Sequence, residues 1–272
     1  MKPYKNLYIY EIKGKVLHPK KIFQEDFLGC WCEGDFSYLF FAKNRKEEVK
    51  EFLHQHPFLS CRSETVIDYK DWETGKELKP FKVGRFYVSP VWEEIEEADH
   101  EIPIKVDPRL AFGSGNHATT KKCLEALCLI YKEARPRRVL DIGCGTGILS
   151  IASAKLGAET ILAVDYSSLA VETTRKNCLI NEVEDKVKIV EGEALDYLSW
   201  KADLLIANIY HSVIKELVEG THFKGKKWYL ISGLLGTESH KITKRLQDLS
   251  INIIQVLNEN LWFTILGKGE SH

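Results

Sequence analysis

The sequence predicts an α/β protein in which a small α+β domain precedes a mostly parallel sheet. The parallel part is indicated by an apolar run, 138–142, which ends in three glycines and leads at once into a helical segment, 148–156. A second apolar run, 160–165, ends in a carboxylate. Near the end of the chain, only three residues separate the apolar runs 251–257 and 261–266. That connection fits an antiparallel hairpin, because parallel neighbours need a crossover of about a dozen residues or more.

Bulk properties narrow the classes of function. The chain has 272 residues, enough for one large or two modest domains, and a formal net charge of -1. This balance gives no basic field to hold a polyanion, so direct readout of a nucleic acid is not expected. The seven cysteines have no Cys-x-x-Cys spacing for zinc and predict reduced thiols in a cytoplasmic protein without a metal. We expect a monomer with no signal peptide and no membrane span, since no apolar run reaches about 18 residues.

The first 75 residues predict a small α+β domain with a ferredoxin-like layout. Val49, Phe52 and Leu53 recur with helical spacing on the charged segment 46–56. Twelve Lys and Arg balance twelve Asp and Glu in residues 1–75, so charge does not identify a partner. A strand-rich module fits the docking of a partner better than it fits chemistry. The expected strands are Tyr4–Ile12, Phe36–Ala42 and Thr65–Tyr69.

Residues 76–106 are expected to form a linker and a hairpin. Two strands, Phe81–Trp92 and Ile102–Asp107, are joined through 93–101, where six of nine residues are acidic. One interpretation of this run is a solvated connector, and the alternative is a segment that attracts a basic protein substrate.

A glycine-rich turn predicts a ligand site at the carboxyl edge of the sheet. Gly143, Gly145 and Gly147 allow a sharp turn and let a ligand lie against the backbone beside the partly positive start of a helix. Asp165, at the end of the next strand, can accept both hydroxyls of a ribose. The spacing, preceded by Asp141, departs from the Gly-x-Gly-x-x-Gly of dinucleotide-binding folds. It resembles the turn of class I methyltransferases, which bind S-adenosylmethionine, although other Rossmann-like folds also carry three glycines in the first turn.

A second unusual stretch, 111–120, precedes the first strand of the sheet. Phe112 begins a loop that contains two glycines and His117, and Thr119 or Thr120 is suited to capping the helix that follows. A loop in this place can close over the methionine end of the cofactor.

The rest of the chain alternates strands and helices, as a parallel sheet requires. Glu193, which follows the third strand, either meets the adenine amino group or is an ordinary loop carboxylate. The expected strands are 187–190, 203–207 and 228–232, and the expected helices are 168–181, 213–218 and 238–249.

Asn208 ends the fourth strand and is the candidate for orienting the methyl acceptor. Its amide carbonyl can accept a hydrogen bond from an amine. Enzymes that methylate amide or adenine nitrogens have Asn/Asp-Pro-Pro-aromatic here, and this chain has neither proline, which favours an aliphatic amine. Lysine, with a reference pKa of about 10.4, must lose a proton first, and desolvation beside a positive sulfonium favours that loss. His117, Tyr210 and His211 are candidates for the proton acceptor or for pocket walls.

Over its whole length, the chain resembles the bacterial methyltransferases that modify ribosomal large-subunit protein eleven. The resemblance implies a mostly parallel seven-stranded sheet with one antiparallel strand, and a small domain that grips the substrate. It implies that Thr120, Gly143, Asp165 and Asn208 contact S-adenosylmethionine, and that lysine side chains and the amino-terminal amine of the substrate are methylated. The matching segments are Pro90–Trp92, Asp107–Thr120, Asp141–Gly147, Ala207–Ile209 and Ser232–Leu235.

Two departures from the family pattern concern the acceptor site. Ser114 replaces the usual Thr and keeps the hydroxyl, whereas Tyr210 and His211 stand where the family generally has Leu-Ala. The alternatives are therefore a methyltransferase acting on another protein or on a small-molecule amine, and a module that binds S-adenosylmethionine without catalysis. The expected domains are a substrate-recognition domain (1–75), the linker and hairpin (76–106), and the methyltransferase domain (107–272).

Overall fold

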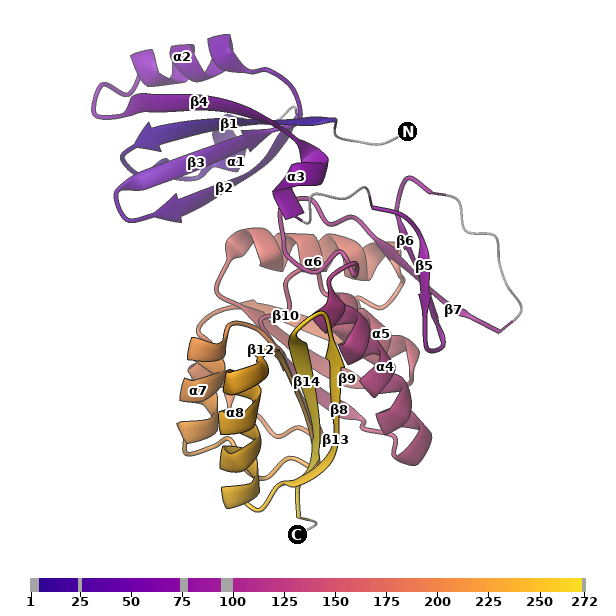
Figure 1. Ribbon diagram of the computed structural model, residues 1–272. Helices are drawn as coiled ribbons and strands as arrows, with labels where there is room; N and C mark the ends of the chain where they lie inside the picture. The colour runs from indigo at the N-terminus through magenta and orange to yellow at the C-terminus, as the bar shows by residue number, and fades with distance from the viewer. Residues whose placement is uncertain (1–4, 24–25, 74–77, 94–99, 271–272) are drawn as a thin grey trace. The chain divides into compact units, whose positions relative to one another are not determined.

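The computed structural model describes residues 5–23, 26–73, 78–93 and 100–270 (Figure 1). The chain forms two compact units, Met1–Leu78 and Lys79–His272. Within the described residues, no helix combines the length and the apolar character needed to cross a membrane.

The first unit is a four-stranded antiparallel sheet with the strand order β2-β3-β1-β4. The order of elements, βαββαβ, is the ferredoxin-like arrangement. Apolar side chains at alternate strand positions, such as Tyr10 and Leu39, form a core with Val49 and Phe52 of α2. The elements are β1 (Asn6–Lys13), α1 (Pro19–Ile22), β2 (Phe27–Glu33), β3 (Phe36–Phe41), α2 (Lys46–His54), β4 (Ser60–Asp68) and α3 (Tyr69–Glu73).

The structure adds three elements that the sequence pattern missed in this unit, α1, β2 and α3, and Tyr69, expected to end a strand, begins α3. The strand β2 lies at the edge of the sheet and contains Gly29, and its last three residues are exposed, so its sequence lacks the alternation of a half-buried strand. The expected strand from Tyr4 begins outside the described residues, and β1 is described from Asn6.

The second unit contains a seven-stranded sheet with the order β10-β9-β8-β11-β12-β14-β13. The strand β14 runs in the opposite direction to the other six strands, which confirms the predicted architecture. The strands are β8 (Arg138–Ile142), β9 (Thr160–Asp165), β10 (Val187–Glu191), β11 (Leu204–Asn208), β12 (Trp228–Leu235), β13 (Asn252–Glu259) and β14 (Trp262–Lys268). The helices are α4 (Ala118–Glu133), α5 (Ile148–Lys155), α6 (Ser168–Ile180), the 3₁₀ helix η1 (Ala194–Tyr197), α7 (His211–Glu219) and α8 (Gly236–Asp248).

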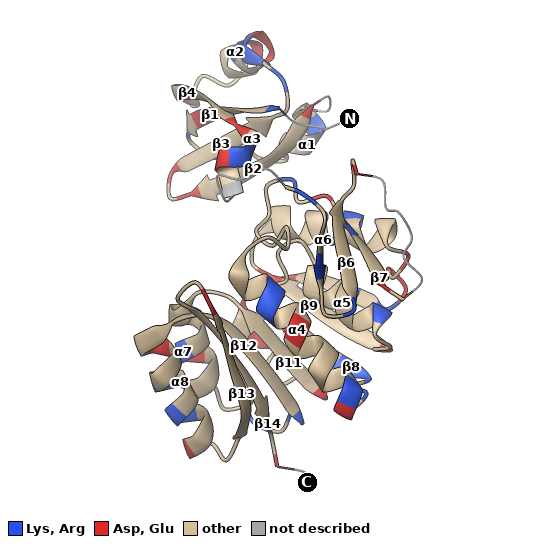
Figure 2. Ribbon diagram, turned by 45° about the vertical axis from the view of Figure 1, so that its right-hand side comes forward, with Lys and Arg blue, Asp and Glu red and all other residues tan. Residues whose placement is uncertain are grey.

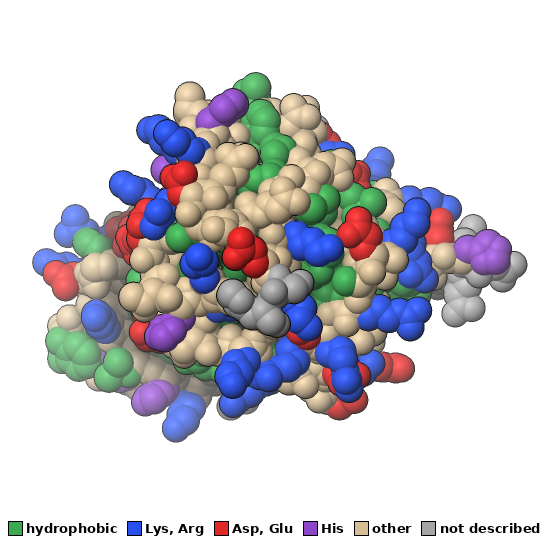
Figure 3. Space-filling view, turned by 90° about the horizontal axis from the view of Figure 1, so that it is seen from below, with side chains coloured by type: hydrophobic (Ala, Val, Ile, Leu, Met, Phe, Trp, Pro, Cys, Tyr) green, Lys and Arg blue, Asp and Glu red, His purple; other side chains and the backbone are tan. Residues whose placement is uncertain are grey.

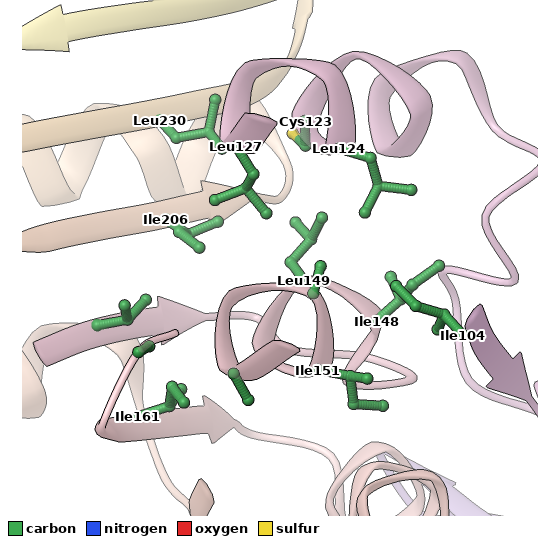
Figure 4. Packing of buried hydrophobic residues seen from close by; sticks show 14 of the residues in the cluster. Ile104, Cys123, Leu124, Leu127, Ile148, Leu149, Ile151, Ile161, Ile206 and Leu230 are labelled. Atoms are coloured by element: carbon green, nitrogen blue, oxygen red, sulfur yellow. The ribbon is translucent and has the colours of Figure 1, made fainter. Parts of the chain in front are cut away.

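Helices cover both faces of this sheet and leave its carboxyl edge for the site. The helices α4, α5 and α6 pack on one face and α7 and α8 on the other (Figure 1). Figure 4 shows Leu127 of α4 and Leu149 of α5 pointing toward Ile206 of β11. Leu205, the next residue back along β11, belongs to the core on the opposite face. Strands buried on both faces explain why the parallel strands read as continuous apolar runs.

A third, three-stranded sheet lies between the two predicted domains in sequence and belongs to the second unit. It consists of β5 (Phe81–Val83), β6 (Phe86–Pro90) and β7 (Ile102–Val106). The expected single strand Phe81–Trp92 is therefore a tight hairpin, whose turn is made possible by Gly84 with φ of 56°. The strands β6 and β7 are parallel, so the two segments joined through 93–101 do not form the expected hairpin, and the antiparallel pair is β5 and β6. Phe86 and Ile104 are fully buried in the same core as α4 and α5.

The charged side chains are distributed around this core. Lys, Arg, Asp and Glu lie mostly on helices and strand ends, while the central strands are largely free of charge (Figure 2). The face seen from below in Figure 3 mixes both signs. Ion pairs at the amino-terminal ends of the parallel strands include Arg137 with Glu159 at 2.6 Å and Lys227 with Asp203 at 3.2 Å. The acidic run 93–101 lies largely outside the described residues, which leave out 94–99.

Candidate active site

The glycine-rich turn after β8 requires glycine at each of its three positions. Gly143, Gly145 and Gly147 have φ of 72°, 56° and 81°, all in the left-handed region. A Cβ on Gly143 would collide with Ile209, and one on Gly145 would collide with the carbonyl oxygen of Phe112. The turn is therefore packed against the segment after β11 on one side and against the 112–117 loop on the other.

Asp165 joins this turn to the end of β9. Its Oδ2 accepts a hydrogen bond from the Gly145 N–H at 2.9 Å, and its Oδ1 accepts one from the Ser167 N–H at 3.0 Å. The residue is only 8% exposed, and burial raises the pKa of its carboxyl above the ordinary value. An ionised carboxylate has about four acceptor positions, so two remain for ribose hydroxyls.

Asp141 is a second buried carboxyl, which the sequence singled out only as part of the motif. It is 1% exposed and accepts a hydrogen bond from the Ser150 hydroxyl at 2.5 Å. Burial raises the pKa of Asp141 to about 6. Because Ser150 lies in the first turns of α5, this bond ties the helix start to the end of β8.

The loop that begins at Phe112 is hydrogen-bonded to the glycine-rich turn. The Phe112 carbonyl accepts the Thr146 N–H at 3.0 Å, and the Gly113 carbonyl accepts the Thr146 hydroxyl at 2.6 Å. The Phe112 side chain is 51% exposed. The backbone of the loop is thus held against the turn, while the Phe112 ring is about half exposed.

His117, and not Thr119 or Thr120, caps α4. Its Nδ1 accepts the Thr119 N–H at 3.4 Å and lies 2.8 Å from the Thr119 hydroxyl. The ring packs between those of Phe112 and Trp262, at centroid distances of 5.3 and 5.1 Å. Burial lowers the pKa of His117, so the neutral ring is favoured. The expected threonine cap is wrong because the helix begins at Ala118, so both threonines already lie in its first turn.

A hydrogen bond to Thr120 orients the side chain of Asn208. Its Nδ2 donates to the Thr120 hydroxyl at 3.5 Å, although the two residues are 88 positions apart in sequence. Thr120 is fully buried, so its link to the site runs through Asn208. With the amide nitrogen facing the protein, the Asn208 carbonyl oxygen is the group available to an acceptor amine.

Glu193 lies two residues beyond the end of β10, the strand that pairs with β9. Glu191 is the register partner of Asp165, and the Gly192 N–H donates to the Asp165 carbonyl at 3.0 Å. Glu193 is exposed and immediately precedes η1. This position is compatible with an adenine contact and with an ordinary loop carboxylate.

The structure brings most of the predicted site residues to one edge and adds others. The three glycines, Asp165, Phe112 and Asn208 are linked there by the contacts described above. Thr146 and Ile209 also belong to this network, and both lie in segments that the sequence singled out, the glycine motif and Ala207–Ile209. Within the described residues, no group of three or more His, Cys, Asp and Glu could hold a metal ion.

The residues fit S-adenosylmethionine because Asp165 keeps acceptor positions for a ribose at the carboxyl edge of the sheet, beside a turn whose left-handed backbone glycine adopts readily. The sheet order and this edge define a class I, S-adenosylmethionine-dependent methyltransferase. A family model described as "Ribosomal protein L11 methyltransferase (PrmA)" matches residues 15–270. The chain belongs to this ribosomal protein L11 methyltransferase family.

Individual relatives agree with this assignment. A ribosomal protein L11 methyltransferase of Clostridium perfringens is 31% identical over 265 residues, covering 96% of this chain and 82% of the relative. The protein of that name from Caldanaerobacter subterraneus subsp. tengcongensis is 38% identical over 207 residues, covering 74% and 66%. A crystal structure of a ribosomal protein L11 methylase from Lactobacillus delbrueckii subsp. bulgaricus matches with a TM-score of 0.62 and 27% identity, covering 71% of this chain and 100% of that one.

Proposed function

We propose that the protein transfers methyl groups from S-adenosylmethionine to lysine side chains and the amino-terminal amine of ribosomal protein L11. The observation that carries this proposal is the Asn208 amide, held by Thr120 at the carboxyl edge beside the glycine-rich turn. The names of the relatives, which cover most of the chain, support L11 as the substrate.

Each residue of the site has a task in this reaction. Bound S-adenosylmethionine supplies a methyl group that is already activated on a sulfonium, so alignment is the main requirement. Asp165 accepts hydrogen bonds from the ribose, Glu193 accepts one from the adenine amino group, and the backbone of the glycine-rich turn lies against the methionine part. Phe112 and the loop that ends at His117 exclude water from the cofactor. The Asn208 carbonyl accepts a hydrogen bond from the acceptor amine. This bond directs the lone pair of the amine nitrogen toward the methyl carbon.

The remaining parts of the proposal concern the partner and the setting. Residues 1–75 recognise the substrate, and the protein works as a cytoplasmic monomer on L11, free or in the ribosome. No metal takes part. The acidic run 93–101 either attracts basic segments of the substrate or serves as a solvated connector.

Labelled cofactor and purified L11 provide the direct test. We expect label in L11 and, by mass spectrometry, mass gains in multiples of one methyl group on lysine-containing peptides or on the amino-terminal peptide. Transfer to a different protein or to a free amine, with L11 unlabelled, would show that the substrate is wrong. Such an outcome is the main alternative, because Tyr210 and His211 differ from the family pattern at the acceptor side.

A binding module without catalysis is distinguished by calorimetry. It would bind S-adenosylmethionine and yet show no turnover with L11 or with any other amine. The intact glycine turn, Asp165 and Asn208 argue against it.

A further inference from the structure

A histidine and a carboxylate meet at the same edge of the sheet, on the side of α7 and α8. His211 is the first residue of α7 and follows Asn208 by three positions. Its Nδ1 lies 3.5 Å from Glu238 Oε1, and the two side chains are 27% and 30% exposed. Glu238 lies in the first turn of α8, which follows β12 directly. Because β12 is the neighbour of β11, with Asn208 paired to Ser232, both helices start beside Asn208.

The Glu238 carboxylate is fixed by a second contact. Its Oε2 accepts the N–H of Leu235, the residue that precedes α8, at 2.8 Å. A carboxylate in the first turn of a helix is also favoured by the helix dipole. One oxygen therefore holds the helix start, and the other is presented to the His211 ring.

The segment that carries His211 is clamped to the site. The Ile209 side chain packs so closely on Gly143, in the glycine-rich turn, that a Cβ there would collide with it. The Ile209 backbone packs equally closely on Gly233 of β12. These close approaches hold residues 208–211 between the turn after β8 and the end of β12. Asn208 and His211 are consequently parts of one rigid edge.

His211 is better placed to take up a proton than His117. The Nδ1 of His117 already accepts the Thr119 N–H as the cap of α4, and the His117 ring lies between two aromatic rings. Glu238 favours the tautomer of His211 that carries its proton on Nδ1, which leaves the Nε2 lone pair as the acceptor. Among the described residues, the contact that the structure shows for the His211 ring is the one between Nδ1 and Glu238.

We propose that His211, oriented by Glu238, accepts the proton that the acceptor ammonium must lose before it is methylated. This inference rests on the proposed amine methylation. The proton moves from the ammonium nitrogen to His211 Nε2, and Glu238 stabilises the imidazolium that results. The neutral amine then forms its bond to the methyl carbon as the carbon–sulfur bond breaks, S-adenosylhomocysteine leaves, and His211 returns its proton to water. Glu238 is a positioning residue in this scheme, because it acts through His211.

Other charged groups on the packed elements set the surroundings of the pair. Lys215 lies one turn further along α7 and Lys241 one turn further along α8, and both are exposed. The 3₁₀ helix η1, which also packs on α7, contributes Asp196, which is exposed as well. Glu238 is the group on these elements that contacts the His211 ring in the structure.

The test is single-turnover methyl transfer as a function of pH with the full-length protein. We expect His211→Ala to slow transfer about a hundredfold at pH 7, in the range of general base catalysis, without changing the affinity for S-adenosylmethionine. Added imidazole should restore part of the rate. Glu238→Gln keeps an acceptor for the Leu235 N–H, and we expect a smaller loss together with a changed pH profile of the transfer rate. His240→Ala, which removes an exposed histidine of α8, serves as the control.

The outcomes separate this inference from the proposed function. An unchanged rate in His211→Ala overturns the proton acceptor, as does a loss that imidazole fails to restore and that parallels weaker cofactor binding. If the wild-type protein methylates another amine and not L11, the substrate is wrong, and the same variants test His211 on that amine. A wild-type protein that methylates no amine overturns both.

Discussion

Asp165 offers the sharpest test of how the cofactor is held. Asp165→Ala removes the acceptor for the ribose hydroxyls and also releases the N–H groups of Gly145 and Ser167. Hydrogen bonds to a charged group contribute roughly 1.5 to 3 kcal/mol. At 1.4 kcal/mol for each factor of ten, we expect the Kd for S-adenosylhomocysteine to rise about ten- to a hundredfold. Isothermal titration calorimetry measures this Kd directly, because S-adenosylhomocysteine is the reaction product and binds without turnover.

Two further variants make this measurement specific. Asp165→Asn keeps the shape of the side chain, but its NH₂ group cannot accept a hydrogen bond, so its Kd should lie between those of the wild type and of Asp165→Ala. Asp248→Ala changes an exposed carboxylate at the end of α8 and should leave the Kd unchanged. Thermal unfolding of each variant checks that the second unit stays folded. An unaltered Kd in folded Asp165→Ala would refute the ribose assignment.

Three other predictions concern the acceptor side, the turn and the buried carboxyl. Thr120→Val removes the hydroxyl bonded to Asn208, and single-turnover methyl transfer should slow about three- to tenfold, as expected for one neutral hydrogen bond. Gly145→Ala should weaken S-adenosylhomocysteine binding at least about tenfold in calorimetry, because a backbone carbonyl occupies the place of its Cβ. Gly157→Ala, also at positive φ but with no atom within 4 Å, is the control that should bind normally. The raised pKa of Asp141, about 6, means that the folded state binds a proton more tightly than the unfolded chain, so stability falls as pH rises through this value. Urea unfolding should show the wild type losing roughly 1 to 2 kcal/mol between pH 5 and pH 8 relative to Asp141→Asn, and parallel curves would contradict the assignment.

The local patterns of the sequence were sufficient for the catalytic fold and for the centre of the site. Apolar runs, helical spacing and the short connection at 258–260 each depend on neighbouring residues, so they predicted the parallel strands and the final hairpin. The glycine-rich turn could be predicted for the same reason, because few residue types other than glycine adopt a left-handed backbone conformation. The edge strand β2 escaped because a strand with an exposed end and an internal glycine has no such pattern.

Contacts between distant segments were decided only by the tertiary structure. Thr120 meets Asn208 because α4 packs across β11, and His211 meets Glu238 because α7 and α8 start at neighbouring strand ends. The cap of α4 also depended on this packing, since the ring of His117 is held by Trp262 from the last strand. The sequence by itself determined which backbone turns and strands form and that a carboxylate ends β9. Which side chains face each other across the site was determined by strand order and register, which place residues far apart in the chain at the same edge of the sheet.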